Sequence, residues 1–404
     1  MTVIAVGALV LAAVVPLYAY LGYPLLLWLM PRRWVPPAVR NDREWPMVTI
    51  VLPVHNEEAV IAGTLDALLA TDYPPARRRI LVVSDASTDG TEDIVRRFAD
   101  RGVELACLPV RAGKTAAENA AADLVRTEVV VNTDASVRLH PAALKALVST
   151  FDDPTVGIAS GRDLSVGSAA SAANVGETGY VDYEMWVRDL ETAAGGIVGA
   201  SGCFFASRRE LQGEIVPEAL SRDFAAPLVA REHGFRAVSV RDAVCYVPRA
   251  GSLRREYRRK VRTMTRGLQT LYFKRHLLKP WRYGLFAWML WSHKLLRWTL
   301  PFSAIVGATS VLLLVGERPS AWAVVGVGVT LAAAVAAGAW WWPAGRPPRL
   351  VAVPAYLLWG VVAALHAWLN AARGDLSPTW EPTRRHDVRG RESDAHSRPP
   401  IFGA

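Results

Sequence analysis

The stretch Arg79-Ile80-Leu81-Val82-Val83-Ser84-Asp85-Ala86-Ser87-Thr88-Asp89-Gly90-Thr91 decides how the chain is interpreted. Its first part, Ile80 to Val83, is a short apolar run rich in β-branched residues, which is typical of a buried strand. The Ser, Asp, Thr and Gly that follow have the composition of a tight turn or a helix cap. In a doubly wound sheet, the loops at the carboxyl ends of the strands form the ligand crevice. Asp85 is therefore predicted either to bind a polar ligand or to lie in a solvated turn.

A second polar loop follows another apolar run, where Val129 to Val131 lead into Asn132-Thr133-Asp134-Ala135-Ser136. Strand patterns at 47–54, 80–84, 103–108 and 129–131 alternate with helix patterns at 57–70, 91–99 and 114–125. This alternation predicts an α/β fold with a parallel sheet and crossover helices. Because the carboxyl ends of parallel strands meet at one edge, Asp85 and Asp134 are predicted to lie at the same edge of the sheet.

Residues 150–250 have a less regular pattern. A polar and aromatic helix is predicted from Tyr180 to Glu191, and the glycine-rich segment from Gly195 to Gly202 is predicted to be a loop. Asp223 lies near the start of a predicted helix that runs to about Glu232 and that Ser221 is expected to cap. The helix dipole also favours an acidic residue in the first turn, so Asp223 has a structural as well as a functional interpretation.

Apolar stretches at both ends of the chain are long enough to cross a bilayer. The first, from about Val3 to Met30, lacks a basic start and a cleavage site, which favours an anchor over a removed signal peptide. Arg32 and Arg33 follow it and place the next segment in the cytoplasm. The later stretches run from Leu295 to Val315, from Ser320 to Trp342 and from Leu350 to Leu369. The positive-inside rule leaves open on which side the polar tail after Arg373 lies.

The net charge of +9 is concentrated between Arg249 and Arg282, just before the last apolar stretches. A basic segment beside a membrane span predicts contact with anionic lipid headgroups. No nucleic-acid-binding motif accompanies this charge, so nucleic acid is not expected as a partner. Phe286 to Trp298 mixes tryptophan with basic residues, as an interfacial helix does. The 3 cysteines are scattered, which fits a reducing compartment.

Several separated motifs resemble those of the membrane-integrated family 2 glycosyltransferases. In chain order they are Val51-Leu52-Pro53-Val54-His55-Asn56-Glu57-Glu58, Ser84 to Thr91, Arg111-Ala112-Gly113-Lys114 with Asn119, Asn132 to Ser136, Ser221-Arg222-Asp223 and Arg258-Arg259-Lys260-Val261-Arg262. They cover about residues 47 to 270 and follow the family's order. The resemblance implies a GT-A domain, which is a Rossmann-like mixed α/β sheet, in the superfamily of the cellulose, hyaluronan and poly-N-acetylglucosamine synthases.

The resemblance also implies how the chain is divided. The expected regions are an N-terminal transmembrane anchor (1–31), a cytoplasmic GT-A domain (46–250), basic interfacial helices (251–298), C-terminal transmembrane helices (295–371) and a polar tail (372–404). The protein is accordingly expected to be a multi-pass protein of the cell (inner) membrane with its catalytic domain in the cytoplasm.

The resemblance implies a nucleotide-sugar donor. In relatives, the positions of Pro53, His55, Glu57 and Asp85 surround the nucleotide base and ribose. Lys114 is expected either to reach the donor diphosphate or to be an exposed helix lysine.

The diphosphate calls for a divalent cation, Mg²⁺ or Mn²⁺. Asp134, Ala135 and Ser136 match the metal-binding Asp-x-Asp of the family, with Ser136 in place of the second acid. A hydroxyl is a weaker ligand than a carboxylate, so this departure puts the second metal contact in question.

Asp223 matches the acid that accepts the proton of the attacking hydroxyl in relatives, a contribution of about 10²–10⁴ in rate. Arg222 stands where many relatives have a second acid, and its charge is expected to depress the pKa of Asp223. Arg259 and Arg262 lie where processive synthases have Gln-x-x-Arg-Trp. The motif here has neither Gln nor Trp, and these arginines either bind substrate or contact the membrane surface.

The sequence therefore predicts an enzyme for inverting hexosyl or N-acetylhexosaminyl transfer to a lipid-linked or growing saccharide acceptor, in cell-surface or exopolysaccharide assembly. The altered arginine motif favours single addition over processive synthesis. The alternative is a non-catalytic membrane scaffold that binds a nucleotide sugar without turnover. A transporter is not expected, because the apolar stretches lack internal repeats.

Overall fold

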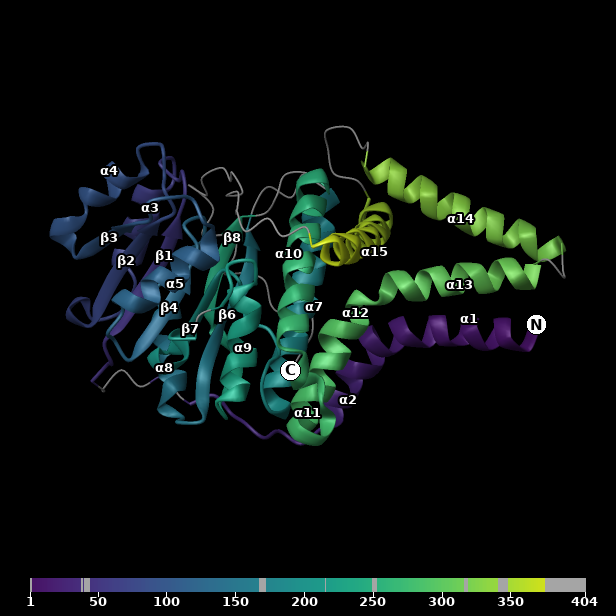
Figure 1. The fold of residues 1–404 in the computed structure, drawn as a ribbon, viewed down its shortest axis with the longest axis horizontal. Helices are drawn as coiled ribbons and strands as arrows, with labels where there is room; N and C mark the ends of the chain where they lie inside the picture. Colours follow the sequence, from purple (N-terminus) through teal and green to yellow (C-terminus); the bar gives the residue numbers. More distant parts are fainter. Residues whose placement is uncertain are drawn as a thin grey trace.

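The computed structural model describes residues 2–37, 39, 44–166, 172–214, 216–248, 253–315, 319–340 and 348–374. Within these residues, an α/β domain carries on one side a group of helices drawn from both ends of the chain (Figure 1). The predicted polar tail lies outside the described residues from residue 375 onwards. The architecture thus combines a mixed α/β domain with apolar helices at both chain ends.

The described strands form one mixed sheet in the order β3-β2-β1-β4-β7-β6-β8-β5. Strand β1 pairs in parallel with both β2 and β4, whereas β7 runs antiparallel to β4 and to β6. The strands are β1 (Val48–Val54), β2 (Arg78–Ser84), β3 (Val103–Cys107), β4 (Val129–Thr133), β5 (Arg138–Leu139), β6 (Val156–Val166), β7 (Phe204–Arg208) and β8 (Arg236–Pro248). The parallel pairing brings the ends of β2 and β4 to one edge, as the alternating pattern predicts.

Helices cover both faces of the sheet, which explains why the central strands are apolar throughout. Ile50 and Leu52 share a buried cluster with Leu65 of α3 (Ile61–Leu69) and Leu144 of α6 (Ala143–Ser149). Val51 points the other way, towards α5 (Lys114–Leu124). Successive residues of a strand face opposite sides of a sheet, so a strand buried on both faces needs apolar residues at every position.

Two helices are shorter than predicted because the loops beside them are fixed by other contacts. The helix expected from residue 57 begins at Ile61, and the backbone N–H of Gly90 donates to Glu58 Oε2 at 2.9 Å. The helix expected to reach residue 99 is α4 (Thr91–Arg96), followed by the 3₁₀ turn Ala99–Arg101. Gly102 then adopts a φ of 82°, a left-handed conformation that suits glycine.

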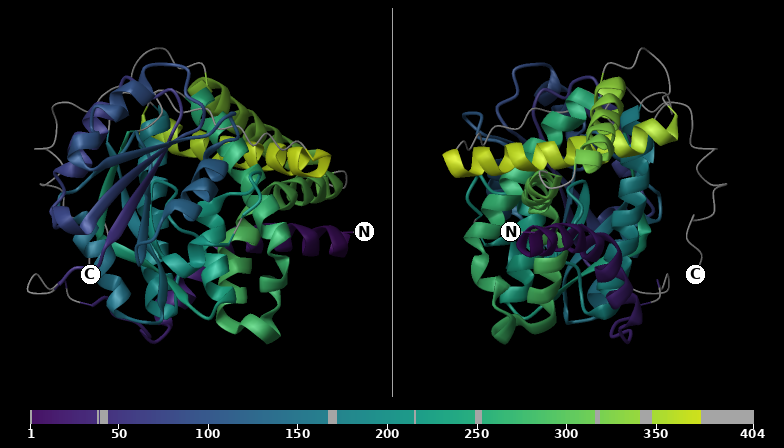
Figure 2. Two further views of the ribbon diagram at one scale, coloured as in Figure 1. Left: turned by 60° about the vertical axis from the view of Figure 1, so that its left-hand side comes forward. Right: turned by 90° about the vertical axis from the view of Figure 1, so that its right-hand side faces the viewer.

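The N-terminal apolar stretch forms α1 (Thr2–Leu17), a π-helical turn (Tyr18–Gly22) and α2 (Tyr23–Leu29). Together they are long and apolar enough to cross a membrane, as is the part of α15 (Arg349–Arg373) from Pro354 onwards. Helix α1 lies beside α13 (Leu300–Val315), and both extend away from the sheet (Figures 1 and 2). Val3 of α1 is 86% exposed, so this apolar surface is available to lipid.

The stretch expected to be a single span from Leu295 to Val315 is not one straight helix. The helices over Pro280–Trp298 and Leu300–Leu314 meet at an angle of 57°. Pro301, the second residue of α13, has no backbone N–H to continue the helical hydrogen bonds across Thr299, which accounts for the break. The stretch expected from Ser320 to Trp342 forms α14 (Pro319–Trp340).

The predicted helix around Tyr180–Glu191 is part of a longer helix, α7 (Ala172–Ala194), which packs against α10 (Leu253–Phe273) and α15. The segment after α10 contains α11 (Pro280–Leu290), a π-helical turn (Trp291–Leu295) and α12 (Leu296–Trp298). The remaining described α-helices are α8 (Arg209–Gln212) and α9 (Arg222–Glu232). Helix α7 therefore separates the sheet from the apolar helices.

A buried group of charged side chains joins α7 to the apolar helices. We call it the interface cluster; its members are Glu184, Arg188, Glu191, His293, Lys294 and Arg297. The ring nitrogens of His293 lie 2.6 Å from Glu191 Oε1 and 2.8 Å from Glu184 Oε1. The hydroxyl of Tyr23 in α2 donates to Glu191 Oε1 at 2.5 Å. The cluster thus ties the N-terminal span to the rest of the protein.

The two carboxylates of this cluster are ionised. Burial alone would raise the pKa of Glu184, but His293, Lys294 and Arg297 hold it well below its usual value. Burial would also raise the pKa of Glu191, but His293 and the Tyr23 hydroxyl lower it. The two ring nitrogens of His293 each lie within hydrogen-bond distance of one of these carboxylates, so the ring bridges Glu191 and Glu184.

We predict that Glu191→Gln lowers the stability of the protein by about 1–3 kcal/mol at neutral pH, because the Tyr23 hydroxyl and the His293 ring lose a buried carboxylate partner. The thermal unfolding midpoint in detergent checks this. Glu210→Gln on the exposed surface of α8 is the matched control and should leave the midpoint unchanged.

The same pair of proteins should differ in their response to acid. A carboxyl group with a lowered folded pKa stabilises the fold above its unfolded pKa, about 4.3 for Glu, and this stabilisation is lost as the pH falls through the folded value. The difference in unfolding midpoint between the wild type and Glu191→Gln should therefore shrink below about pH 4. An advantage that persists undiminished at pH 3 would contradict this assignment.

Candidate functional site

The loops after β1 and β2 are held together at the carboxyl edge of the sheet. His55 is buried, and its Nδ1 lies 2.7 Å from the backbone oxygen of Asp85. The backbone N–H of Glu57 donates to the Thr91 hydroxyl at 2.8 Å. Asn56 has a positive φ of 54°, which is uncommon for a residue other than glycine. Pro53 is buried in β1 and pairs with a residue of β2, so it supports the loop from within the sheet.

Asp85 fixes the loop that leads into α5. Its two carboxylate oxygens accept the backbone N–H groups of Ala112 at 2.7 Å and Gly113 at 2.8 Å. Asp85 is 2% exposed, so neither oxygen faces open solvent. Gly113 has a φ of 98°, which lets the chain turn directly into the helix. In this arrangement Asp85 positions Lys114, the first residue of α5.

Lys114 is not an exposed helix lysine. Its ammonium lies 2.6 Å from Asp134 Oδ1 and 4.0 Å from Glu118 Oε1, and it donates to the backbone oxygen of Gly202 at 2.8 Å. Burial alone would lower the pKa of Lys114, but Asp134, Glu118 and Asp223 together raise it well above its usual value. Lys114 is therefore a fixed positive charge at the point where three carboxylates converge.

Glu118 was not among the residues predicted for the site. It lies one turn after Lys114 in α5 and is 3% exposed. Burial raises the pKa of its carboxyl group, while Lys114 and Arg222 oppose the shift. The spacing of four residues from Lys114 was visible in the sequence, but an i, i+4 pair of this kind is also common on solvated helix faces.

Asp223 lies in the first turn of α9, close to the same loop. A Cβ on residue 202 would lie 2.6 Å from Asp223 Oδ2, so glycine at this position lets the carboxylate approach the backbone. Ser221 is at the N-cap position, but its hydroxyl donates to the Asp223 carboxylate and not to the helix backbone. The prediction that Ser221 caps the helix with its side chain is therefore wrong.

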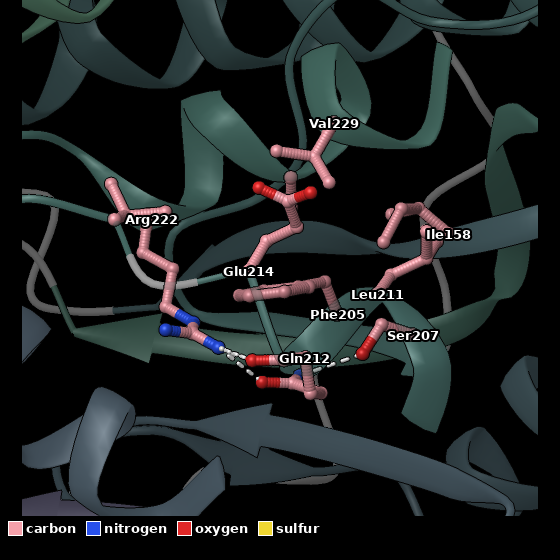
Figure 3. A pocket seen from close by; sticks show the side chains of 10 residues that line it. Ile158, Phe205, Ser207, Leu211, Gln212, Glu214, Arg222 and Val229 are labelled. Atoms are coloured by element: carbon pink, nitrogen blue, oxygen red, sulfur yellow. Dashed lines mark hydrogen bonds between the residues drawn. The ribbon is translucent and has the colours of Figure 1, made fainter. Parts of the chain in front are cut away.

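Arg222 points away from Asp223. Its guanidinium donates to the Oδ1 of Asn119 and to the Oε1 and backbone oxygen of Gln212. Figure 3 shows this side chain turned towards Gln212 in a small pocket that Phe205 and Val229 also line. Arg222 was expected to act on the charge of Asp223. Its guanidinium instead has a structural role, because these hydrogen bonds tie α9 to α5 and α8.

The other residues predicted to bind substrate or metal are placed as follows. Asp134 follows β4 directly, and its side chain is 16% exposed. Ala135 is buried, and its backbone oxygen accepts the Thr64 hydroxyl at 2.5 Å. Ser136 is half-buried in the same loop. In the described part of the chain, no three His, Cys, Asp or Glu side chains are grouped so that they would hold a metal ion by themselves.

Arg259 and Arg262 both lie on α10. Arg259 pairs with Glu256, one turn earlier, at 2.8 Å. Arg266 was not among the site residues predicted from the sequence motifs, yet it reaches the site. Its Nη2 donates to the Thr115 hydroxyl at 2.7 Å and to the backbone oxygen of Leu220 at 2.5 Å. It thereby connects α10 to the starts of α5 and α9. Its position one turn after Arg262 on the same helix was the available signal.

Comparison with known proteins identifies the family and the fold of the domain that carries most of these residues. The family model described as Glycosyl transferase family 2 matches residues 49–214. A probable glycosyltransferase of Bacillus subtilis, YdaM, is 44% identical over 69 residues, which are 17% of this chain and 16% of that protein. The beta-monoglucosyldiacylglycerol synthase of Nostoc is 28% identical over 156 residues, 38% of this chain and 33% of that protein. The chain thus spans a third or less of the length of these two relatives.

A solved structure resembles the chain over nearly its whole length. The mannosyltransferase PcManGT from Pyrobaculum calidifontis, in complex with GDP-Man and Mn²⁺, matches with a TM-score of 0.69 and 24% identity. The match covers 92% of this chain and 98% of that one. This likeness shows the GT-A fold. Residues 49–214 of the chain are therefore a glycosyl transferase family 2 domain built on that fold.

Proposed function

We propose that the protein is a membrane-bound glycosyltransferase that moves a sugar, with inversion, from a nucleotide-sugar donor to a lipid-linked or growing saccharide. The observation that carries this proposal is the meeting of Lys114, Asp134 and Asp223 around the backbone of Gly202. Lys114, Asp134 and Gly202 belong to the family 2 domain, and Asp223 follows it in the chain. This arrangement supplies a fixed cation and two carboxylates at the carboxyl edge of the sheet, where α/β folds bind their ligands.

The donor would bind in two parts. The loops that contain Pro53, His55, Glu57 and Asp85 are proposed to surround the nucleoside. Lys114 is a compact, partly exposed ammonium and is suited to a phosphate group. Asp85 would act mainly through the loop it holds, because both of its carboxylate oxygens already accept backbone N–H groups.

A divalent ion, Mg²⁺ or Mn²⁺, fits the same loop. Asp134 offers a partly exposed carboxylate and Ser136 a hydroxyl, both hard oxygen donors. The ion would share the Asp134 carboxylate with the Lys114 ammonium, which lies 2.6 Å from Oδ1. The protein supplies few ligands of its own, so the phosphates of the donor would complete the set. When bound, the ion would neutralise charge on the diphosphate.

Asp223 is proposed to accept the proton of the acceptor hydroxyl during a single displacement at the anomeric carbon. The acceptor hydroxyl is a poor nucleophile, and a positioned carboxylate compensates for this. Gly202 and the Ser221 hydroxyl hold the carboxylate in place. Because the Arg222 guanidinium is engaged with Asn119 and Gln212, it does not form an ion pair with Asp223.

The acceptor is proposed to reach the site from the membrane. The exposed apolar surface of α1 and the basic residues of α10 support a location at the cytoplasmic face of the cell membrane, in contact with anionic lipids. The proposed role in cell-surface or exopolysaccharide assembly follows from this location. Arg259 and Arg262 remain candidates for contact with acceptor or donor, and the pairing of Arg259 with Glu256 favours a structural part for Arg259.

We predict that Asp223→Asn lowers the turnover of the correct donor by about 10²–10⁴, because the acceptor hydroxyl loses its proton acceptor, while donor binding is retained. Detergent-purified protein is supplied with UDP-, GDP- or dTDP-sugars and a membrane lipid extract, and nucleoside diphosphate release is measured. Asp242→Asn, at an exposed position of β8, is the matched control. Donor binding without turnover by the wild type across the whole panel would instead favour the non-catalytic scaffold.

We also predict that Asp134→Asn reduces metal-stimulated turnover at least about tenfold, since losing a ligand should cost no less than losing a residue that supports one. The wild type should lose activity in EDTA and regain it with Mn²⁺ or Mg²⁺. Asp123→Asn, exposed at the end of α5, serves as the control. An unchanged metal response in Asp134→Asn would show that Asp134 is not a ligand.

Ser136→Asp provides the converse test. It restores the second carboxylate of the family pattern, so the half-maximal metal concentration should fall. A rise in that concentration would argue against Ser136 as a neighbour of the ion.

A further inference from the structure

The interface cluster carries an excess of positive charge in a buried setting. Within the cluster, the cations Arg188, Lys294 and Arg297 are opposed by the carboxylates of Glu184 and Glu191. The neighbouring Asp189, which also acts on Arg188, is paired with Arg241 at 2.7 Å. Buried charges are normally matched by partners, because an unpaired one is costly to remove from water. The cluster is thus short of negative charge.

The cluster also has hydrogen-bond donors without acceptors. Arg188 is 8% exposed, and its Nε and Nη1 have no hydrogen-bond partner within the described structure. Its nearest carboxylate oxygen, Oε1 of Glu184, is 3.7 Å away, too far for a hydrogen bond. The nitrogen of Lys294 lies 3.5 Å from that same oxygen. The two Arg188 nitrogens are thus unsatisfied where most buried polar groups are paired, whereas Lys294 makes one long hydrogen bond to Glu184.

The unsatisfied donors lie next to the proposed base. Arg188 Nη2 donates to the backbone oxygen of Ala200 at 3.3 Å, and the N–H of Ala200 donates to the backbone oxygen of Asp223 at 3.3 Å. Lys294 approaches the same segment, because its nitrogen would lie 3.2 Å from a Cβ on Gly199. Its side chain is 15% exposed, so the ammonium is not sealed off from ligands. The loop segment from Gly199 to Gly202 thus separates Asp223 from Arg188 and Lys294.

We propose that Arg188 and Lys294 bind a phosphate group of the acceptor, so that the acceptor is a sugar linked to its lipid through phosphate. A guanidinium with two free N–H groups and a neighbouring ammonium suit phosphate oxygens. The cluster joins α7 to the membrane helices at α2 and at the turn before α12, which is where a lipid headgroup would lie. This proposal rests on the proposed function.

Binding is tested apart from catalysis. Dodecyl phosphate is titrated into the full-length protein in dodecyl maltoside micelles and followed by calorimetry. The neutral detergent shares the alkyl tail, so the signal reports the phosphate. Lys294→Met and Arg188→Met should each weaken binding about 10- to 100-fold, the usual effect of losing a charged hydrogen bond. Lys279→Met and Arg282→Met, at exposed positions, should bind as the wild type does.

Glu184→Gln keeps the test decisive even if the methionine variants fold poorly. It removes one negative charge from the cluster, so dodecyl phosphate should bind more tightly than to the wild type. A misfolded protein would not show this gain. Weaker binding by well-folded Glu184→Gln, or unchanged binding by the methionine variants, would overturn the proposed site.

Two further arms identify the source of the phosphate and separate this proposal from the enzymatic one. Inorganic phosphate should bind more weakly than dodecyl phosphate, and equal affinities would overturn the lipid assignment. Asp223→Asn should bind dodecyl phosphate normally, because the site does not depend on turnover. Phosphate binding without sugar transfer by the wild type would defeat the proposed function, whereas transfer without phosphate binding would defeat only the acceptor site.

Discussion

The candidate site depends on one fixed ammonium. Lys114 is fixed by Asp134 at 2.6 Å and by the backbone oxygen of Gly202 at 2.8 Å, with Glu118 nearby. Without this cation, the carboxylates brought together from β4, α5 and α9 would repel one another in a medium of low dielectric constant. The ammonium therefore makes it possible to concentrate acids at the edge of the sheet. The same concentration of negative charge attracts a divalent metal ion, and the ion together with the ammonium offsets the negative charge of a bound diphosphate.

The position of Lys114 follows from the sheet topology. Strands β2 and β4 flank β1 in parallel, so their loops share an edge, and Asp85 at the end of β2 binds the backbone just before α5. The lysine is thereby aimed across β1 at Asp134. Asp85 in one loop thus positions Lys114, and the Lys114 ammonium contacts Asp134 in another loop. Asp85 can therefore shape the site even though both of its carboxylate oxygens already accept backbone N–H groups.

The strands were predictable because they are buried on both faces and therefore apolar throughout, and the loops were predictable because their motifs follow a known order. The side-chain contacts that could not be predicted are those between residues far apart in the chain. Arg222 precedes Asp223 directly, yet its guanidinium lies with Asn119 and Gln212. Arg266 reaches Thr115 and Leu220 from another helix. Local sequence spacing does not encode where the side chains of Arg222 and Arg266 point, because their orientations are set by how α5, α9 and α10 pack.

The glycine-rich segment after α7 links the two charged regions of the protein. On one side, the absence of a side chain at Gly202 lets the Asp223 carboxylate approach, and on the other, the same absence at Gly199 admits Lys294. Ala200, between them, is bonded to Arg188 and to the backbone of Asp223. A side chain at either glycine would push the membrane-side cations and the sheet-side acids apart. The glycine-rich loop thus keeps the interface cluster and the acids at the edge of the sheet one backbone segment apart, which is the separation that the two proposed sites need if they are to hold a single acceptor.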